Sequence, residues 1–443
     1  MNTRKLLILA SVTVIVTAAV VYGRPLLDRP LPQAEAQAMV ADAAERGDTV
    51  ALGKLAHRQC RSLAAAEQQP CYEEFFVELS SGERVRLALG ALAVLGGLDS
   101  RVALDGHVYV HLIGIRSWQP GRPVGQVFGS CTGLFQSGCY HGVIQAYLTA
   151  EAGVDSARAA TLCDVIEADA PGRWLRFQCA HGLGHGLSMI HNWDLPRALS
   201  ECDWLNTDWD RQSCYGGAFM ENAVASSPGG HHAPADLLAG RDSVANANHA
   251  EHEGHEMGSG PPAFKMRDSA DALYPCSIME RKYLAGCYQL QGGIILNRVN
   301  YDFEAAMTEC DKAPDFVRHE CYLSLGTNSS GFTGQNTKRS IEHCSHGNPD
   351  YQPWCFVGVA KNYIDMTAEP EDGMAFCREV PVGKSRQQCF VAVGEQIRVL
   401  HMTDAATRER LCATAAEDGR DACRYGSALI PPPPGLPLIP GQP

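Results

Sequence analysis

The spacing of 18 cysteines is the feature that most constrains the fold of this 443-residue chain. Taken in order, the cysteines form nine neighbouring pairs, and seven of the nine pairs are 11 or 12 residues apart. From Cys276 to Cys412 the first cysteines of successive pairs recur at steps of 34, 34, 33 and 35 residues. A fixed period in the thirties is typical of helical hairpins that stack into a solenoid. The sequence therefore predicts an all-α fold, a disulfide-stapled helical-hairpin repeat or α-solenoid.

We expect each neighbouring pair to form a disulfide across one hairpin. An even number of cysteines is typical of a chain that folds in an oxidising compartment, and the close cysteine pairs of zinc sites are absent from the sequence. Closing a loop of about a dozen residues contributes roughly 3 kcal/mol in the chain-entropy model. The expected pairs are Cys60–Cys71, Cys131–Cys139, Cys163–Cys179, Cys202–Cys214, Cys276–Cys287, Cys310–Cys321, Cys344–Cys355, Cys377–Cys389 and Cys412–Cys423.

The residues around each pair predict how a hairpin is built. Seven units carry an aromatic residue directly after the second cysteine, and seven carry a small residue two positions further on. We expect helix A of each unit to end near the first cysteine and helix B to begin near the second. The aromatic residue then fills the core between the helices, and the small residue lets their backbones approach.

In period and helix pairing, this architecture resembles tetratricopeptide and Sel1-type solenoids. The characteristic residue patterns of those repeats are absent from the chain, so the resemblance concerns the architecture only.

The N-terminus carries a membrane-targeting signal. Arg4 and Lys5 precede 18 residues without a charge, from Leu6 to Gly23. This length is just enough to span a bilayer, which favours an uncleaved signal anchor over a cleaved signal peptide. The positive flank leaves the N-terminus in the cytoplasm. We therefore expect the bulk of the chain to be periplasmic or extracellular, with the membrane as a partner.

The chain divides into segments by composition. An apolar run, Leu87–Leu98, reads as a core helix rather than a second membrane span, because it contains two glycines and is flanked by charge. The expected segments are a signal anchor or transmembrane helix at 1–24, a linker and first helix at 25–50, the repeat domain at 51–430, a His- and Gly-rich loop insertion at 226–262, and a Pro-rich disordered tail at 431–443.

The overall charge excludes one class of partner. The net charge is −13 and the pI is about 5.6. Nucleic-acid binding needs a basic face, so we expect no nucleic-acid partner.

Histidines gather in the first half of the chain, where 11 of the 16 lie between His107 and His255. His107 and His111 are four residues apart, as are His181 and His185, so each pair shares one helix face. His141 and His181 occupy the same repeat position, two residues after the second cysteine. Equivalent positions of neighbouring repeats stack side by side, so we expect these two side chains to converge.

Two glycines beside the second histidine pair, Gly184 and Gly186, are not required by the repeat pattern. Each costs a helix roughly 1 kcal/mol relative to alanine. A local rule broken in this way is typical of functional sites. The glycines indicate that another helix, a ligand or a metal approaches the backbone here.

These patterns predict a transition-metal site built from His107, His111, His141, His181 and His185. Neutral imidazoles suit Zn, Cu or Fe, and an open coordination position would allow the metal to activate water or dioxygen. Glu221 is a weak candidate for a carboxylate ligand or general base. In the alternative interpretation the histidines cap helices or hydrogen-bond core carbonyls.

The loop insertion carries a separate group of histidines: His231, His232, His249, His252 and His255. Their separation by Glu, Gly and Ala is typical of metal-scavenging tracts. A solvated acidic loop and a lid over the neighbouring site are the alternatives.

The leading functional hypothesis is a membrane-anchored, extracytoplasmic metal-dependent enzyme with oxidative or hydrolytic chemistry. The sequence has no nucleophile elbow, P-loop, dinucleotide fingerprint, HExxH or CxxCH motif. Two alternatives remain. One is a non-catalytic scaffold that binds a protein or peptide on the solenoid, and the other is a metal-binding or metal-delivery protein that uses the loop.

Overall fold

The structure is a computed structural model that describes residues 29–80, 84–151, 154–169, 173–225 and 264–437. These residues form helices and connections, with no strand among them, as the sequence predicts. They fall into two compact units that divide between Asp105 and Gly106, inside the range 51–430. Each unit is described by itself below.

The first unit contains the N-terminal helices of the described chain. Its helices are α2 (Gln33–Glu45), α3 (Thr49–Cys60), α4 (Ala65–Ser80), α5 (Val85–Leu98) and the start of α6 (Ser100–Ser117). Helix α5 buries Leu89, Leu92 and Leu95, so the apolar run is a core helix as expected.

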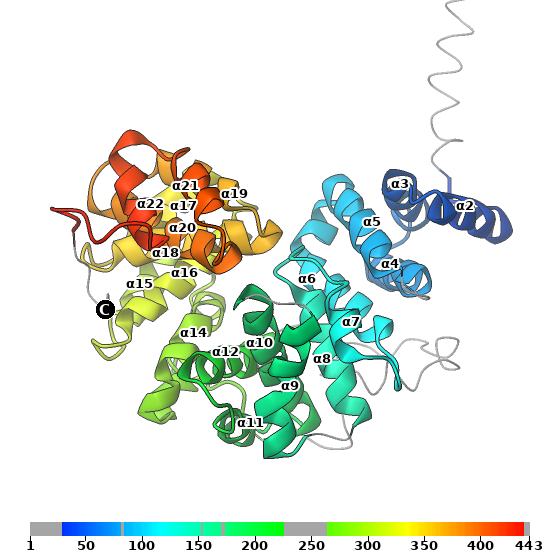
Figure 1. Ribbon diagram of the computed structural model, residues 1–443, viewed down its shortest axis with the longest axis horizontal. Coiled ribbons are helices and arrows are strands. Elements are labelled where there is room, and N and C mark those ends of the chain that lie inside the picture. The colour runs from blue at the N-terminus through cyan, green and yellow to red at the C-terminus, as the bar shows by residue number, and fades with distance from the viewer. Residues whose placement is uncertain (1–28, 81–83, 152–153, 170–172, 226–263, 438–443) are drawn as a thin grey trace, which may run out of the picture. The chain divides into compact units, whose positions relative to one another are not determined.

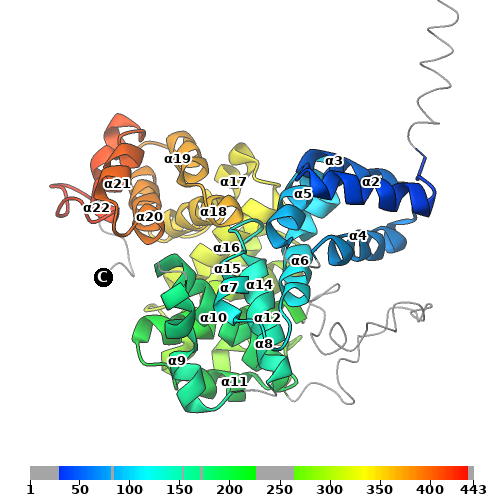
Figure 2. The same cartoon turned by 45° about the vertical axis from the view of Figure 1, so that its right-hand side comes forward.

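The second unit holds most of the cysteine pairs and all the described cluster histidines. Its helices are the rest of α6, α7 (Val124–Phe128), α8 (Gly138–Ala150), α9 (Ser156–Asp169), α10 (Arg173–Ile190), α11 (Leu195–Cys202), α12 (Asp208–Ala225), the 3-10 turns η1 (Cys276–Ile278) and η2 (Arg281–Tyr283), α14 (Leu284–Arg298), α15 (Phe303–Cys310), α16 (Arg318–Phe332), α17 (Thr337–Cys344), α18 (Gln352–Thr367), α19 (Pro370–Glu379), α20 (Lys384–Leu400), α21 (Ala405–Cys412), η3 (Glu417–Gly419) and α22 (Arg420–Gly426). Figures 1 and 2 both place α8, α10 and α12 side by side, and α10 contacts each of the other two helices.

All nine expected cysteine pairs are disulfides in the structure, with Cα–Cα distances of 5.4–5.7 Å. The second cysteine of every pair lies in the first two turns of a helix, as predicted. Five helices end at a first cysteine, namely α3, α11, α15, α17 and α21. The other four first cysteines depart from this rule: Cys131 lies in a connection, Cys163 inside α9, Cys276 in η1, and Cys377 two residues before the end of α19.

The loop between helix A and helix B is held by the arginine three residues before the second cysteine. In three of the cysteine-paired hairpins, this arginine side chain donates a hydrogen bond to the backbone carbonyl three residues after the first cysteine. The bonds are Arg211 to Leu205, Arg318 to Ala313, and Arg386 to Val380. The disulfide and this hydrogen bond therefore close the same short loop twice.

The connection from helix B to the next helix A also repeats. In 192–194 and in 300–302, two residues with positive φ precede an aspartate. The carboxylate then caps the next helix, accepting from the backbone N–H of Arg197 or Ala305. The left-handed pair reverses the chain and the cap starts the new helix, so the turn geometry is encoded locally.

The aromatic residue after each second cysteine lies in the core, as expected. Tyr72, Tyr288 and Tyr322 are at most 1 % exposed, and Phe390 is fully buried. The phenol of Tyr322 donates to Asp311, the residue after the first cysteine of its unit, at 2.8 Å. The ring thus fills the hairpin interior while its hydroxyl is satisfied at the loop.

Two predicted segments, the signal anchor at 1–24 and the loop insertion at 226–262, are not among the described residues. Among the helices that are described, none combines the length and the apolar character needed to cross a membrane. Of the tail, residues 431–437 form no helix, and Gln388 of α20 donates a hydrogen bond to the carbonyl of Pro437.

Removing one disulfide should lower the free energy of unfolding without changing the fold. Replacing both Cys310 and Cys321 with alanine opens a bridge between residues 11 apart. We expect a loss of about 3 kcal/mol, measured by denaturant unfolding, because the unfolded chain regains the entropy of the closed loop. A loss below about 0.5 kcal/mol would mean that hairpin packing alone orders this loop.

Candidate metal centre

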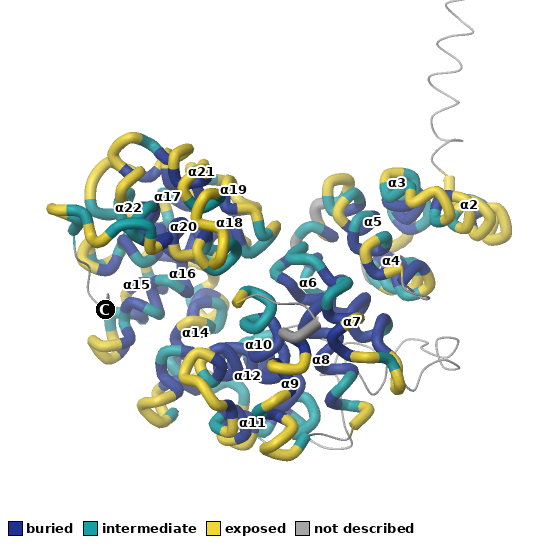
Figure 3. Tube along the Cα trace, in the orientation of Figure 1, coloured by how far each residue is buried: buried dark blue, intermediate teal, exposed yellow. Residues whose placement is uncertain are grey.

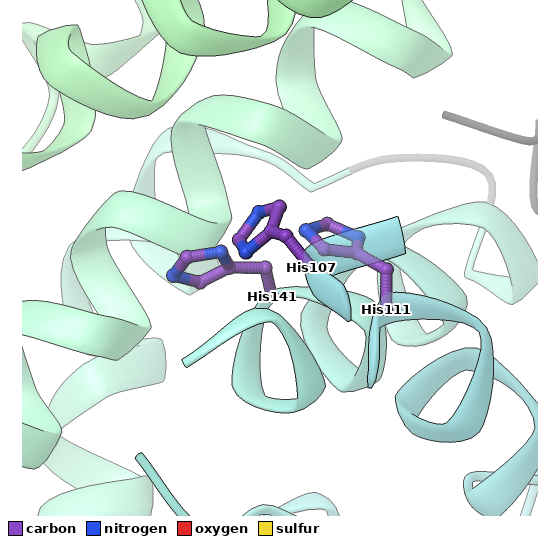
Figure 4. A group of neighbouring side chains, drawn as sticks. All are labelled: His107, His111 and His141. Carbon is purple, nitrogen blue, oxygen red and sulfur yellow. The ribbon is translucent and has the colours of Figure 1, made fainter. Parts of the chain in front are cut away.

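Five histidines from three neighbouring helices meet in the second unit. His107 and His111 project from α6, His141 from α8, and His181 and His185 from α10. Figure 4 shows the first three side chains turned toward one another. The expected convergence of His141 and His181 is present, with ring centroids 4.9 Å apart.

Close contact between the helix backbones brings these rings together. A Cβ atom at Gly142 of α8 would overlap the carbonyl oxygen of His111 on α6. Between α10 and α12 the contact is reciprocal: a Cβ at Gly184 would overlap the Cys214 carbonyl, and one at Gly217 would overlap the His181 carbonyl. Only glycine permits this spacing.

The structure therefore explains the glycines that the repeat pattern did not require. The neighbour of Gly184 is helix α12, and a Cβ at Gly186 would overlap the side chain of Leu148 on α8. The same reciprocal arrangement joins α16 to α18 and α20 to α22, through Gly326 and Gly358 and through Gly394 and Gly426. Of the three expected neighbours, another helix, a ligand or a metal, the structure shows another helix at both positions. The glycines are therefore packing residues beside the histidines and do not by themselves mark a functional site.

The cluster is buried. His111, His141 and His185 are at most 2 % exposed, and His181 is 9 % exposed. Figure 3 shows that burial extends along α8 and α10, the helices that carry three of the five rings. His107 is half-buried.

Each imidazole places one ring nitrogen against an oxygen acceptor. The pairs are His107 Nδ1 with Phe135 O at 2.9 Å, His111 Nδ1 with Gln145 Oε1 at 3.1 Å, His141 Nε2 with Gln178 Oε1 at 3.0 Å, His181 Nδ1 with Ser213 O at 3.2 Å, and His185 Nδ1 with Glu221 Oε2 at 2.8 Å. Since these oxygens accept, the nitrogen facing each one carries the proton. The second ring nitrogen then bears the lone pair, which is the arrangement found in metal-bound histidines.

Glu221 has a defined place beside the cluster. Its carboxylate is fully buried, accepts from His185 Nδ1, and also accepts from the indole N–H of Trp193 at 3.3 Å. A carboxylate in this position orients the imidazole and raises its basicity toward a metal. Glu221, the weak candidate for a carboxylate ligand or general base, thus lies next to the expected site. It contacts the ring of His185 on the Nδ1 side and would support that ligand.

Sequence reasoning missed the residues that hold the rings. Gln145 lies four residues after His141, and Gln178 lies three residues before His181, so both share a helix face with a cluster histidine. Both glutamines are at most 2 % exposed. A polar residue three or four positions from a histidine on the same helix was the signal that could have identified these two glutamines. The backbone acceptors Phe135 and Ser213 carry no signal in the sequence.

Burial favours the neutral form of two cluster histidines, His141 and His181. Burial lowers the pKa of His141 well below its usual 6.5, and three neighbouring imidazoles lower it further, whereas the hydrogen bond that His141 donates to Gln178 raises it. The pKa of His181 is also well below 6.5, first because of burial and then because of His185. Neutral imidazoles are the form that binds metal.

Other described histidines are isolated from the cluster and have ordinary structural partners. His191 pairs with Glu201 at 2.7 Å, and His343 accepts or donates to Ser329 at 2.9 Å while stacking on Phe303. The structural interpretation fits these residues. The five loop histidines between His231 and His255 lie outside the described residues.

Two groups of three cluster histidines have the spacing of a metal site. In each group one ligand atom per residue lies within 4.8 Å of the others, and the groups are His107, His111 and His141, and His141, His181 and His185. Zinc–imidazole bonds of 2.0–2.1 Å in a tetrahedron require nitrogens about 3.3 Å apart. Nitrogens as far apart as 4.8 Å would have to move closer together to bind zinc in this way.

Comparison with known proteins gives no further guide to function. No protein-family model matches the chain, and neither the curated proteins nor the solved structures include a match.

The glycine contact can be tested by adding one methyl group. Gly184→Ala should lower the free energy of unfolding by about 1–3 kcal/mol, because the Cβ overlaps the Cys214 carbonyl. Gly331→Ala in α16 is the matched control, since nothing lies within 4 Å of its Cβ position. The control should be neutral or more stable by up to about 1 kcal/mol. Equal effects of the two changes in denaturant unfolding would contradict the packing role.

The neutral cluster also predicts how stability depends on pH. In the unfolded chain the histidines take up protons near pH 6.5, whereas folded His141 and His181 do so only at lower pH. The unfolded state therefore binds more protons below pH 6.5, and metal-free protein should lose about 1.4 kcal/mol per pH unit for each such histidine. The measurement is denaturant unfolding between about pH 7 and pH 5.

The His141→Gln variant is the comparison for that experiment. It removes one of the two depressed groups, so its stability should fall less steeply with decreasing pH than that of the wild type. Parallel curves for the two proteins would show that His141 takes up protons equally in both states.

Proposed function

We propose that this protein is an extracytoplasmic metalloprotein whose transition-metal centre is the buried five-histidine cluster. One observation carries the proposal: imidazoles from α6, α8 and α10 are in mutual contact, and each has a ring nitrogen against an oxygen acceptor. Histidines that only fill a core have no need of such an arrangement of five oriented lone pairs.

The donor set favours particular metals. Imidazole nitrogen suits Zn and Cu, and iron sites add carboxylate ligands. Glu221, the carboxylate beside the cluster, is engaged by His185 and Trp193. We therefore favour Zn or Cu over Fe.

A three-histidine site with an open fourth position is the arrangement of catalytic metal centres. Such a metal lowers the pKa of bound water or polarises a bound oxygen. We propose on this basis that the protein is a metal-dependent enzyme with hydrolytic or oxidative chemistry. The least buried rings of the cluster are His107, which is half-buried, and His181, which is 9 % exposed and stacked on Phe177 with centroids 5.4 Å apart. A substrate would approach the metal past one of these two rings.

The setting of the centre is part of the same proposal. The apolar segment within 1–24 would anchor the chain, and nine disulfides are suited to an oxidising periplasmic or extracellular location. The recurring cysteine period and the contacts of α8, α10 and α12, and of α14, α16 and α18, each with the next, support stacking of the hairpins as a solenoid.

A second candidate function is protein or peptide binding. A cavity of about 540 Å³ lies between the N-terminal ends of α14 and α16, and Arg281, Phe316 and His319 are among its lining residues. The Arg281 guanidinium lies 3.7 Å above the Phe316 ring. Exposed aromatic and arginine side chains are the residues that dominate protein interfaces. A scaffold of this kind would keep its partner when the histidine cluster is altered.

The metal proposal predicts a specific loss. Full-length protein purified from an oxidising compartment should contain Zn or Cu, and the double variant His181→Gln/His185→Gln should contain clearly less of it while remaining folded. The reason is that these substitutions remove two of the five nitrogen ligands but leave the disulfides and glycine contacts in place. The measurement is elemental analysis together with the helical circular dichroism signal.

The matched control is His343→Gln, which changes a histidine outside the cluster and should keep its metal. Protein that contains no metal, under conditions that load known metalloproteins, would overturn the proposal and leave the binding scaffold. Metal that is lost on deletion of 226–262 and kept in the double variant would instead indicate a delivery protein that uses the loop.

A further inference from the structure

The two groups of three histidines share one member. His107 and His111 of α6 form one group with His141, and His181 and His185 of α10 form the other group with the same residue. His141 has ring contacts with all four, at centroid distances of 5.7, 5.4, 4.9 and 4.9 Å. His111 and His185 also meet directly, with centroids 5.5 Å apart, but only His141 belongs to both groups.

The two ring nitrogens of His141 face different helices, α6 and α10. Figure 4 shows one ring nitrogen turned toward His107 and the other turned away from both α6 histidines. Nε2 lies 3.0 Å from Gln178 on α10, and Nδ1 is buried with no hydrogen-bond partner among the described residues. Nδ1 is therefore the ligand atom for the α6 side, and Nε2 points to the helix that carries the second pair.

We propose that the cluster holds two metal ions bridged by His141. One ion is bound by His107, His111 and Nδ1 of His141, and the other by His181, His185 and Nε2 of His141. This inference rests on the proposed metal centre and adds the number of metal ions that it holds. With bonds of 2.0–2.1 Å on both sides of one imidazole ring, the two ions lie about 6 Å apart.

Binding of the second ion requires a definite exchange of bonds. The Nε2–H proton of His141 leaves to solvent, the hydrogen bond to Gln178 Oε1 breaks, and a metal–nitrogen bond forms in its place. The ring becomes an imidazolate with one negative charge. Together with the Glu221 carboxylate on His185, it offsets two of the four positive charges of a divalent pair.

The two metal positions have similar ligands, but the hydrogen-bond acceptors behind those ligands differ, so their metal affinities should differ. On the α6 side the supporting acceptors are the neutral oxygens of Phe135 and Gln145, whereas on the α10 side one acceptor is the Glu221 carboxylate. A charged acceptor makes His185 the more basic ligand. The α10 position should therefore bind its ion more tightly once the bridge has formed.

The test is the number of ions per chain. Full-length protein is loaded with Cu²⁺, dialysed to remove weakly bound ions, and assayed for copper and for protein. Two ions per chain are expected in the wild type, one in His111→Gln, one in His181→Gln, and two in the control His401→Gln. The wild-type value decides the question even if a variant fails to fold.

A second readout tests the bridge itself. Two Cu²⁺ ions that share an imidazolate are magnetically coupled, so the electron paramagnetic resonance signal of the wild type should be weaker than its copper content requires. One ion per chain, or two ions with full signal intensity, would overturn the shared-histidine centre and leave the metalloprotein proposal intact. No copper in any protein, with Zn²⁺ giving the same result, would overturn both.

Discussion

Direct contact between helix backbones, with glycine on both sides, is the constraint on which the described second unit depends. Between α10 and α12, Gly184 faces one carbonyl and Gly217 faces another, so neither helix tolerates a Cβ there. The helices consequently approach more closely than side-chain packing would allow. The same device joins α6 to α8, and histidine side chains four residues apart then reach across the seam. Without that spacing, the rings would face solvent or aliphatic side chains.

The environment of the cluster follows from this spacing. Close helices exclude water, and exclusion of water favours neutral imidazole over imidazolium. A buried polar nitrogen is costly unless it is bonded, so each ring has an oxygen acceptor at one nitrogen. The chain thus bears the cost of orienting five polar rings before any ligand binds. Metal binding would offset that cost, because free energy gained at a site formed only in the folded chain stabilises the fold.

What could be predicted from the sequence was what the chain encodes over short distances. The disulfides were predictable because joining neighbouring cysteines across a short loop costs the least chain entropy. The aromatic residue after each second cysteine likewise indicated the core of each hairpin. The convergence of His141 and His181 was predictable because repeats place equivalent residues side by side.

Longer-range features were not predictable in the same way. Gly184 was expected to mark the approach of a helix, a ligand or a metal. A helix is what approaches, but no sequence pattern marks its contact atom, the carbonyl oxygen of Cys214. Gln145 and Gln178 were overlooked because a buried amide looks like a surface residue until its burial is known. Glu221 was correctly placed near the histidines, but whether a carboxylate contacts the metal or a ligand ring depends on angstrom-scale geometry that spacing does not contain.

The pairing of every cysteine also affects competition among ligands. His141 and His181 each follow a disulfide cysteine by two residues, so the reduced, unfolded chain would offer a thiol two residues away from each imidazole. Thiolates outcompete imidazoles for soft ions such as Cu(I) and bind zinc strongly. Oxidation consumes all 18 thiols in nine bridges. In the proposed metalloprotein the disulfides would act as protecting groups: once the thiols are oxidised, the imidazole nitrogens bind the metal without competition from thiolates.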